Sequence, residues 1–482
     1  MRCRDSISKL PDEILGKILS LVPTKVAAST SVLSKRWRNL MVLVDNICFD
    51  ESMVVYPDKE EETRGSHLFS DFVEKQFSLL SDSHIIKKLS LSHTTRDCIN
   101  YEYYRWIWTL MERGLLELHL HASRGNSYFF IERELLTSNT LVKLTLSGAY
   151  ILGVQHVFFP ALKSLSILSV TGLDGPNFSG LIRGSPVLEE LYILNDQLLL
   201  PCYGTIVQSA SIKRLVVFLD FPDAKDDHRV TYCGAPNLVY LDYSSYVFEY
   251  YQFVDLDTLV EARLSIKLGE STNRYDYSDD YDNDYGDGEP IFGDVTNLVA
   301  GITSITTLHL SPDSLEAFHF CCESMPVFKN LLNLSIESHE EKGWQVMPVL
   351  LKSCPNLHTL AIKGLVHRVT NKCGDACACS PKKNHKHKKM KIVNEEKLCC
   401  LETCQVKVLK ISEYGGSFQE LKQMKHFLDK LQCLETVKVG FNTNDNIDFL
   451  QANLLALPRL SKKKNIFSLS HIKTLYNQVV LA

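Results

Sequence analysis

Cysteine and histidine, the side chains that most often bind transition metals, gather in one part of the sequence. Cys373, Cys377 and Cys379 are followed by His385 and His387. Structural zinc sites usually contain two CxxC-like pairs at a defined separation, whereas a CxxxCxC run followed by HKH is irregular. We therefore interpret this segment as a solvated loop and predict neither a metal ligand nor a cofactor in the chain. Zinc binding is the alternative hypothesis.

Two other segments carry dense charge. The run YDYSDDYDNDYGDGEP has the acidic composition of a calcium loop but not the register of an EF-hand, so we interpret it as a flexible acidic loop. The run KKNHKHKKMK is a hypothetical nuclear-import signal or nucleic-acid contact. It contains no aromatic residue on which a base could stack, which favours a solvated charged run.

Motifs of the common enzyme classes are missing from the sequence. We find no GxSxG elbow, no P-loop lysine motif and no HExxH. The chain is therefore predicted to have no active site of its own.

Composition narrows the class of protein further. The chain has 482 residues, 45% of them hydrophobic and 23% charged, which is typical of soluble globular protein. A formal charge of -5 argues against nucleic-acid and anionic-membrane partners. No apolar run reaches the roughly 18–20 residues that cross a bilayer, and the N-terminus has no apolar signal core. We expect a protein of the cytoplasm, the nucleus or both, with its 15 cysteines reduced.

The first elements expected are three short helices within residues 8–41. Pro11 suits the first turn of the first helix, Pro23 ends it, and Thr24 can cap the second. The third is predicted from about Ser29 to Leu40. So small a domain buries little surface alone, so a partner protein should cover its remaining apolar residues. A helical cap for the rest of the chain is the alternative.

The string LPDEILGKILSLVPTKVAASTSVLSKRWRNL closely resembles the F-box, in the form common in plant proteins. The match covers nearly the whole motif and departs at Met41, where a second tryptophan is frequent. The resemblance implies that residues 1–50 bind a Skp-type adaptor and, through it, the cullin and RING subunits of a ubiquitin ligase. The adaptor-binding residues that it implies are Leu10, Pro11, Ile14, Leu15, Ile18, Leu19, Val22, Pro23, Val26, Leu33, Ser34, Lys35, Arg36 and Trp37.

Beyond the F-box, the pattern aliphatic-x-x-aliphatic-x-aliphatic returns at intervals of mostly about 21 to 29 residues, the period of leucine-rich repeats. Each repeat supplies one strand and buries its aliphatic face only by stacking on its neighbours. We predict a leucine-rich-repeat solenoid, or horseshoe, over residues 80–370, whereas unrelated β-strands would not keep this interval. The copies begin at residues 86, 115, 141, 162, 188, 212, 238, 305, 331 and 357, with a weak copy at 259, and prolines at 160, 186, 236 and 355 predict turns before strands.

Two longer intervals predict inserted loops, an acidic one at about 270–290 and a Cys/Lys/His-rich one at 371–397. Residues 398–445 are predicted to form strand, helix and strand, with the helix from about Ser417 to Leu431. This stretch resembles the FBD domain that closes many plant F-box/leucine-rich-repeat proteins, and we interpret it as a cap for the solenoid. Residues 446–482 are left as a C-terminal tail.

The α/β fold expected is thus a small three-helix F-box, a solenoid and an FBD-like cap. Joined to the resemblance, it implies a non-catalytic substrate-recognition subunit of an SCF-type (Skp–cullin–F-box) ubiquitin ligase that holds an unidentified protein target. The alternatives are a repeat-based scaffold outside ubiquitination and a receptor that needs a small ligand. Target contacts are expected at variable positions on the exposed strand face: Glu189, Glu190, Tyr192, Lys213, Arg214 and His358.

Overall fold

The structure is a computed structural model that divides into two compact units, Met1–Leu219 and Asp220–Ala482. We describe each unit by itself. The residues described are 7–51, 71, 73–77, 86–93, 101–123, 129–131, 133–152, 156–170, 175–195, 206–220, 230–248, 250–269, 293–370, 372–378, 400–442, 447–457 and 466–469.

The first unit begins with the three predicted helices, α1 (Asp12–Leu19), α2 (Thr24–Ser29) and α3 (Lys35–Leu40). The third helix starts later than predicted. A 3₁₀ turn follows α2, and the hydroxyl of Ser34 then accepts a hydrogen bond from the backbone N–H of Trp37 at 3.4 Å. A serine in that role caps a new helix, which is why α3 begins at Lys35.

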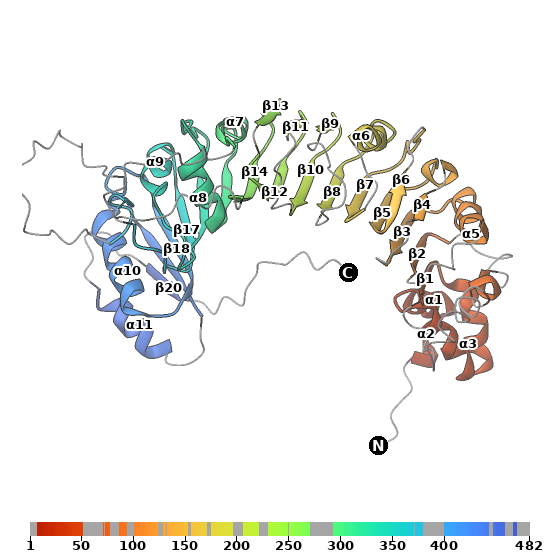
Figure 1. Cartoon of the computed structure of the whole chain (residues 1–482). Coiled ribbons are helices and arrows are strands. Elements are labelled where there is room, and N and C mark those ends of the chain that lie inside the picture. Colours follow the sequence, from red (N-terminus) through yellow and green to blue (C-terminus); the bar gives the residue numbers. More distant parts are fainter. Residues whose placement is uncertain are drawn as a thin grey trace, which may run out of the picture. The chain divides into compact units, whose positions relative to one another are not determined.

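Parallel strands make up the rest of the first unit, with helices and short strands beside them (Figure 1). The main strands are β1 (Asn46–Asp50), β2 (Lys88–His93), β3 (Glu117–Ala122), β5 (Lys143–Gly148), β7 (Ser164–Leu168), β8 (Glu190–Asn195) and β10 (Arg214–Leu219). The other elements are β4 (Phe129–Ile131), β6 (Tyr150–Leu152), β9 (Ile206–Gln208), α5 (Tyr101–Glu112) and α6 (Gly175–Arg183).

The second unit repeats this arrangement. Its main parallel strands are β12 (Tyr240–Tyr246), β14 (Glu261–Lys267), β15 (Thr307–Leu310), β16 (Asn333–Glu337), β17 (Thr359–Lys363), β18 (Val408–Tyr414), β19 (Thr436–Phe441) and β20 (Ile466–Leu469). Beside them lie β11 (Val230–Gly234), β13 (Tyr250–Val254), α7 (Thr296–Gly301), α8 (Pro312–Cys321), α9 (Met347–Lys352), α10 (Phe418–Lys430) and α11 (Ile447–Leu455). Within the described ranges, no helix is both long and apolar enough to cross a membrane.

Every predicted repeat copy coincides with a strand, so the solenoid prediction is confirmed. In the copy that contains β16, the side chains of Leu331, Leu334 and Ile336 are all fully buried. Leu331 precedes the strand and the other two alternate along it, as a period of two requires. The prolines lie in the expected turns, where the residue two positions after proline donates its N–H back across the turn, as in Leu188 to Ser185 at 3.2 Å.

Two predicted boundaries are corrected. Residues 46–50, assigned to the F-box, form β1 and pair in parallel with β2, so the sheet begins inside that range. Residues 446–482, left as a tail, include α11 and also β20, which pairs with β19. The parallel sheet therefore continues through the FBD-like stretch, because its strands carry the same alternating aliphatic pattern.

We expect the buried repeat leucines to carry most of the stability of the solenoid. Leu334→Ala should lower the free energy of unfolding by about 2–5 kcal/mol, because it leaves a cavity in a close-packed core. Leu332, two residues earlier, is 45% exposed, so Leu332→Ala should change it by less than about 0.5 kcal/mol. Urea unfolding of both variants tests this, and equal losses would contradict the strand register.

Candidate adaptor-binding and target-binding surfaces

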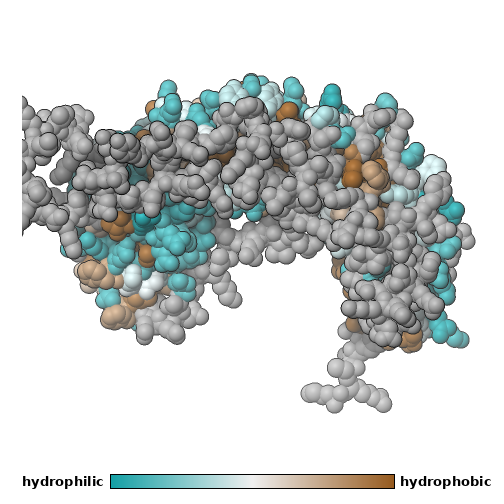
Figure 2. All heavy atoms as spheres, viewed as in Figure 1, coloured by the Kyte–Doolittle hydropathy of each residue, from teal (hydrophilic) through white to brown (hydrophobic). Residues whose placement is uncertain are grey.

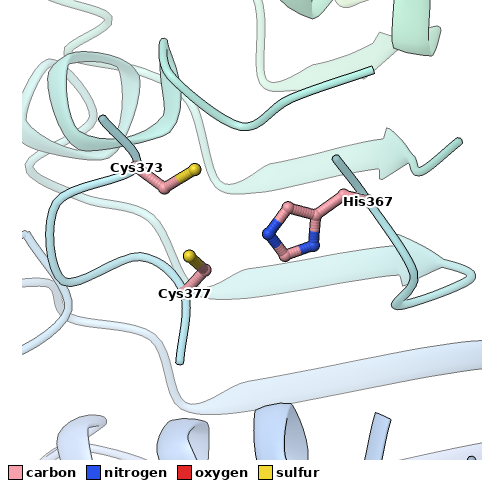
Figure 3. Close-up of side chains that lie close together, drawn as sticks. All are labelled: His367, Cys373 and Cys377. Atoms are coloured by element: carbon pink, nitrogen blue, oxygen red, sulfur yellow. The ribbon is translucent and has the colours of Figure 1, made fainter. Parts of the chain in front are cut away.

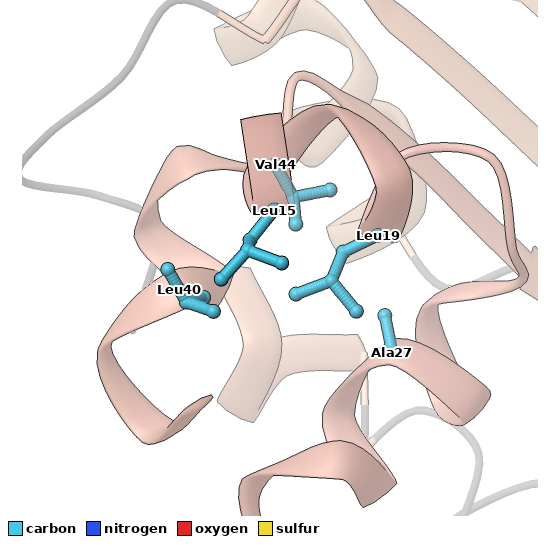
Figure 4. Packing of buried hydrophobic residues seen from close by; sticks show 5 residues of the cluster. All are labelled: Leu15, Leu19, Ala27, Leu40 and Val44. Carbon is cyan, nitrogen blue, oxygen red and sulfur yellow. The ribbon is translucent and has the colours of Figure 1, made fainter. Parts of the chain in front are cut away.

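The three F-box helices close around one small core (Figure 4). Leu15 and Leu19 from α1 meet Ala27 from α2, Leu40 from α3 and Val44, which follows α3. All five side chains are at most 3% exposed. The helices are thus held together by a handful of aliphatic contacts.

The outer surface of the same helices is also apolar. Residues four apart share a helix face, so Ile14 and Ile18 both point outward from α1, and each is about two-fifths exposed. Leu21 and Val32 are more than 80% exposed, and Leu33 is 66% exposed. Large aliphatic side chains concentrated on so small a domain mark a surface that another protein covers.

Arg36 ties the start of α1 to α3. Its Nη2 lies 2.6 Å from Oδ1 of Asp12, and it also donates a hydrogen bond to the backbone carbonyl of Leu10. Both side chains of the ion pair are more than a third exposed, so it orients the helices more than it stabilises them.

The structure divides the predicted adaptor-binding residues into two groups. Leu15 and Leu19 lie inside the core, so they support the outer face and do not form it, which corrects their predicted role. The outward group is Pro11, Ile14, Ile18, Val26, Leu33, Ser34 and Lys35, whereas Leu10, Val22, Pro23, Arg36 and Trp37 are half-buried.

Hydrogen bonds fasten the F-box to the first strand of the sheet. The hydroxyl of Thr24 accepts from the backbone N–H of Cys48 at 2.8 Å, and that of Ser20 accepts from the N–H of Asp45 at 3.1 Å. The amide of Asn46 donates to the carbonyl of Ser20 at 2.7 Å. The outer F-box face therefore has a defined orientation to β1.

The structure brings five predicted target contacts together on β8 and β10 of the first unit and on the residues just before these strands. Glu190 of β8 lies opposite Arg214 of β10 in the register, and Tyr192 follows on β8. The Glu189 carboxylate lies 3.4 Å from Nζ of Lys213. The sixth, His358, is an exposed residue just before β17 of the second unit.

A polar pocket that sequence reasoning missed lies on the strand face of the second unit. Its volume is about 290 Å³. Four of its side chains, those of Asp242, Arg263, His309 and Ser335, come from the fifth position of successive repeat copies, so comparing that position between copies could have found it. The pocket is lined by Asp242, Arg263, Leu264, Ser265, His309, Leu310, Ser311, Ser335 and Glu337.

An arginine and a neutral histidine share one carboxylate at this pocket. Arg263 donates a hydrogen bond from Nε to Oε1 of Glu261 at 3.0 Å, and Nε2 of His309 lies 3.4 Å from the same oxygen. Burial and, to a smaller extent, the nearby Arg263 lower the pKa of His309, while Glu261 opposes both effects, and the result is a pKa of about 4. His309 is therefore uncharged at neutral pH.

The lowered pKa of His309 predicts a loss of stability in acid. Between its folded pKa of about 4 and its unfolded value of about 6.5, the unfolded chain binds more protons, so stability falls as pH falls. His309→Gln removes this effect. The stability advantage of wild type over that variant should shrink from pH 7 to pH 4.5 in urea titrations. Ser335→Ala, in the same pocket, should show no such trend, and an identical trend in both variants would contradict the burial of His309.

Three potential metal ligands do meet in the second unit (Figure 3). Donor atoms of His367, Cys373 and Cys377 all lie within 4.8 Å of one another, and all three residues are buried. However, the sulfur of Cys377 is in a disulfide and is not a thiolate. The described residues then offer two donors, fewer than structural zinc takes, so we propose no metal site here.

The segment around these cysteines is not the solvated loop that we predicted. Residues 372–378 pack against α10, with Cys373 and Cys377 at most 3% exposed. Gln423 of α10 accepts from the N–H of Ala378 at 2.8 Å and donates to the carbonyl of Ala376 at 3.1 Å. These side-chain bonds satisfy the buried backbone, which a sequence pattern does not reveal. Cys379, His385, His387, the basic run and the acidic loop lie outside the described residues.

The predicted C-terminal helix is confirmed as α10. Ser417 and Glu420 form a capping box at its start, and Met424, Phe427 and Leu428 are buried. Figure 2 shows hydrophobic atoms at the surface over α10 and α11, where Phe418 and Phe449 are mostly exposed.

Comparison with known proteins agrees with both parts of this structure. The F-box domain family matches residues 7–47, and the family described as "FBD-associated F-box protein At5g56370, LRR repeats" matches residues 103–218. F-box/LRR-repeat protein At1g48400 of Arabidopsis thaliana is 65% identical and aligns with 96% of this chain and 98% of its own length. F-box protein At4g27050, also of Arabidopsis thaliana, is 49% identical, with 96% and 99% aligned.

The similarity thus runs through the F-box and the repeats together. With its outward aliphatic face on three short helices and its stack of LxxLxL strands, this chain belongs to the plant F-box/leucine-rich-repeat protein family.

Proposed function

We propose that this chain is the substrate-recognition subunit of an SCF-type ubiquitin ligase. The F-box binds a Skp-type adaptor, and the repeats hold a protein target. The observation that carries the proposal is the outward aliphatic face of α1 to α3, exposed on a domain whose own core is already complete.

Burial of that face by a partner would make the free energy of association more favourable. Each aliphatic side chain that a partner buries contributes on the order of 1 kcal/mol, and interface energy concentrates in a few central residues. Ile14 and Ile18 stand side by side on α1, so they are the strongest candidates for that centre. A Skp-type adaptor is the partner that the F-box family implies.

In this proposal the chain brings a target close to the ubiquitin-conjugating enzyme and catalyses no step itself. Family members of this kind are typically non-catalytic adaptors. In the proposed complex the adaptor joins a cullin, whose RING subunit recruits a charged ubiquitin-conjugating enzyme. The repeats then raise the effective concentration of a target lysine near that enzyme. Such a complex acts in the cytoplasm or the nucleus, which is the location that we propose.

We expect Ile14→Asp/Ile18→Asp to weaken adaptor binding by about 100-fold or more, because it places two charges in an apolar interface. Isothermal titration of the full chain with a purified Skp-type adaptor measures the loss. Lys17→Asp, also exposed on α1, is the matched control and should cost less than about tenfold. Circular dichroism should show unchanged helix content in both variants.

Either of two results would reject the proposal. One is that the wild-type chain does not bind the adaptor. The other is that both variants bind as tightly as wild type, which would leave a repeat-based scaffold outside ubiquitination.

A further inference from the structure

Charge is unevenly distributed along the strand face of the second unit. At the end formed by β12 to β16, carboxylates outnumber cations around the polar pocket. On these strands Asp242, Glu261 and Glu337 are three carboxylates, and Arg263 and Lys267 are two cations, which leaves a net charge of -1 because His309 is neutral. This end of the face favours a positive group.

The other end of the face is positive. Lys410 of β18 and Lys438 of β19 lie directly opposite each other in the register, and both are exposed. No ion pair joins either lysine to a carboxylate within the part of the chain that the structure describes. Like charges directly opposite each other destabilise a sheet, so this pair costs stability unless a partner neutralises it.

The other lysines on, or just before, the main strands of the second unit do have a carboxylate neighbour. Nζ of Lys267 lies 3.4 Å from Asp220, and that of Lys363 lies 3.4 Å from Glu337. Lys407 precedes Lys410 on the same stretch of chain and lies 3.9 Å from Glu435. Among the lysines of these strands, Lys410 and Lys438 are therefore the two whose charge is available to an external anion.

The two ends lie on one row of side chains, which fixes their separation. His309, Ser335, Ala361, Lys410 and Lys438 occupy matching positions on β15 to β19. Neighbouring strands are about 4.8 Å apart, so the lysines lie about 14 and 19 Å from His309. An extended chain rises about 3.3 Å per residue, so four to six residues would span that gap.

The pocket has room for one side chain. At about 290 Å³ it falls at the lower limit of the pockets that enclose drug-sized ligands, which run from roughly 300 to 1,000 Å³. Its polar lining is two carboxylates, three serine hydroxyls, the neutral His309 and Arg263, whose guanidinium is paired with Glu261. Carboxylate and hydroxyl oxygens accept hydrogen bonds, which suits a cationic side chain that donates several.

We propose that the strand face of the second unit binds an extended segment of a protein target with two charged features. A lysine or arginine enters the pocket, and acidic side chains four to six residues away contact Lys410 and Lys438. The idea that the segment belongs to a target rests on the proposed function, whereas the surface itself is independent of the F-box.

Selection from a random dodecapeptide display library by the full chain tests this surface. Bound peptides should be enriched in a basic residue separated by four to six positions from acidic ones. Lys410→Glu/Lys438→Glu should abolish the acidic enrichment, and the best wild-type peptide should bind this variant about tenfold more weakly or worse. Lys422→Glu/Lys425→Glu makes the same charge change on exposed positions of α10 and should leave the selection unchanged.

A second variant tests the pocket separately. Asp242→Asn/Glu337→Gln should remove the basic enrichment and keep the acidic one. The proposal fails if wild type selects no such pattern, or if the lysine variant selects the same acidic peptides as wild type. Adaptor titration of the same samples separates the outcomes, because a chain that binds adaptor but selects no charged pattern loses only this surface.

Discussion

A single repeat of this chain cannot bury its own aliphatic residues, and the rest of the structure depends on that constraint. Leu331, Leu334 and Ile336 reach complete burial only because strands of the same pattern lie on both sides of β16. The inward positions are therefore fixed as aliphatic, while the alternate positions are free to vary. This division leaves a rigid face whose polar residues can be chosen for binding.

The F-box, by contrast, forms its core without neighbouring repeats. Five side chains form its buried core, other hydrophobic side chains pack half-buried against them, and further aliphatic residues face outward. Whereas the solenoid buries its aliphatic residues internally, the F-box leaves several of its own exposed, as is typical of a surface that binds another protein. In the solenoid the hydrophobic effect thus drives folding, and in the F-box we propose that it drives association.

Most of the fold could be predicted because its signal is local. The aliphatic at the start of each copy and the two on the strand identified the strands, and the F-box string identified the helices. Features that depend on residues far apart in the sequence were not predicted. The pocket joins Asp242 to Glu337 across several repeats, and the burial of residues 372–378 depends on hydrogen bonds from Gln423. The short β11 and β13 strands and the α11 helix carry too few periodic residues to stand out.

The hydrogen bonds that join Thr24 and Ser20 to the chain at β1 have a geometric consequence. Since these hydrogen bonds join the F-box directly to the first strand, the F-box is a fixed starting point for the strands of the first unit. Each further strand lies about 4.8 Å beyond the one before it. Gain or loss of a repeat in this unit would move its far end in discrete steps of that size, so the distance from the F-box to that end can evolve without any change in the F-box itself.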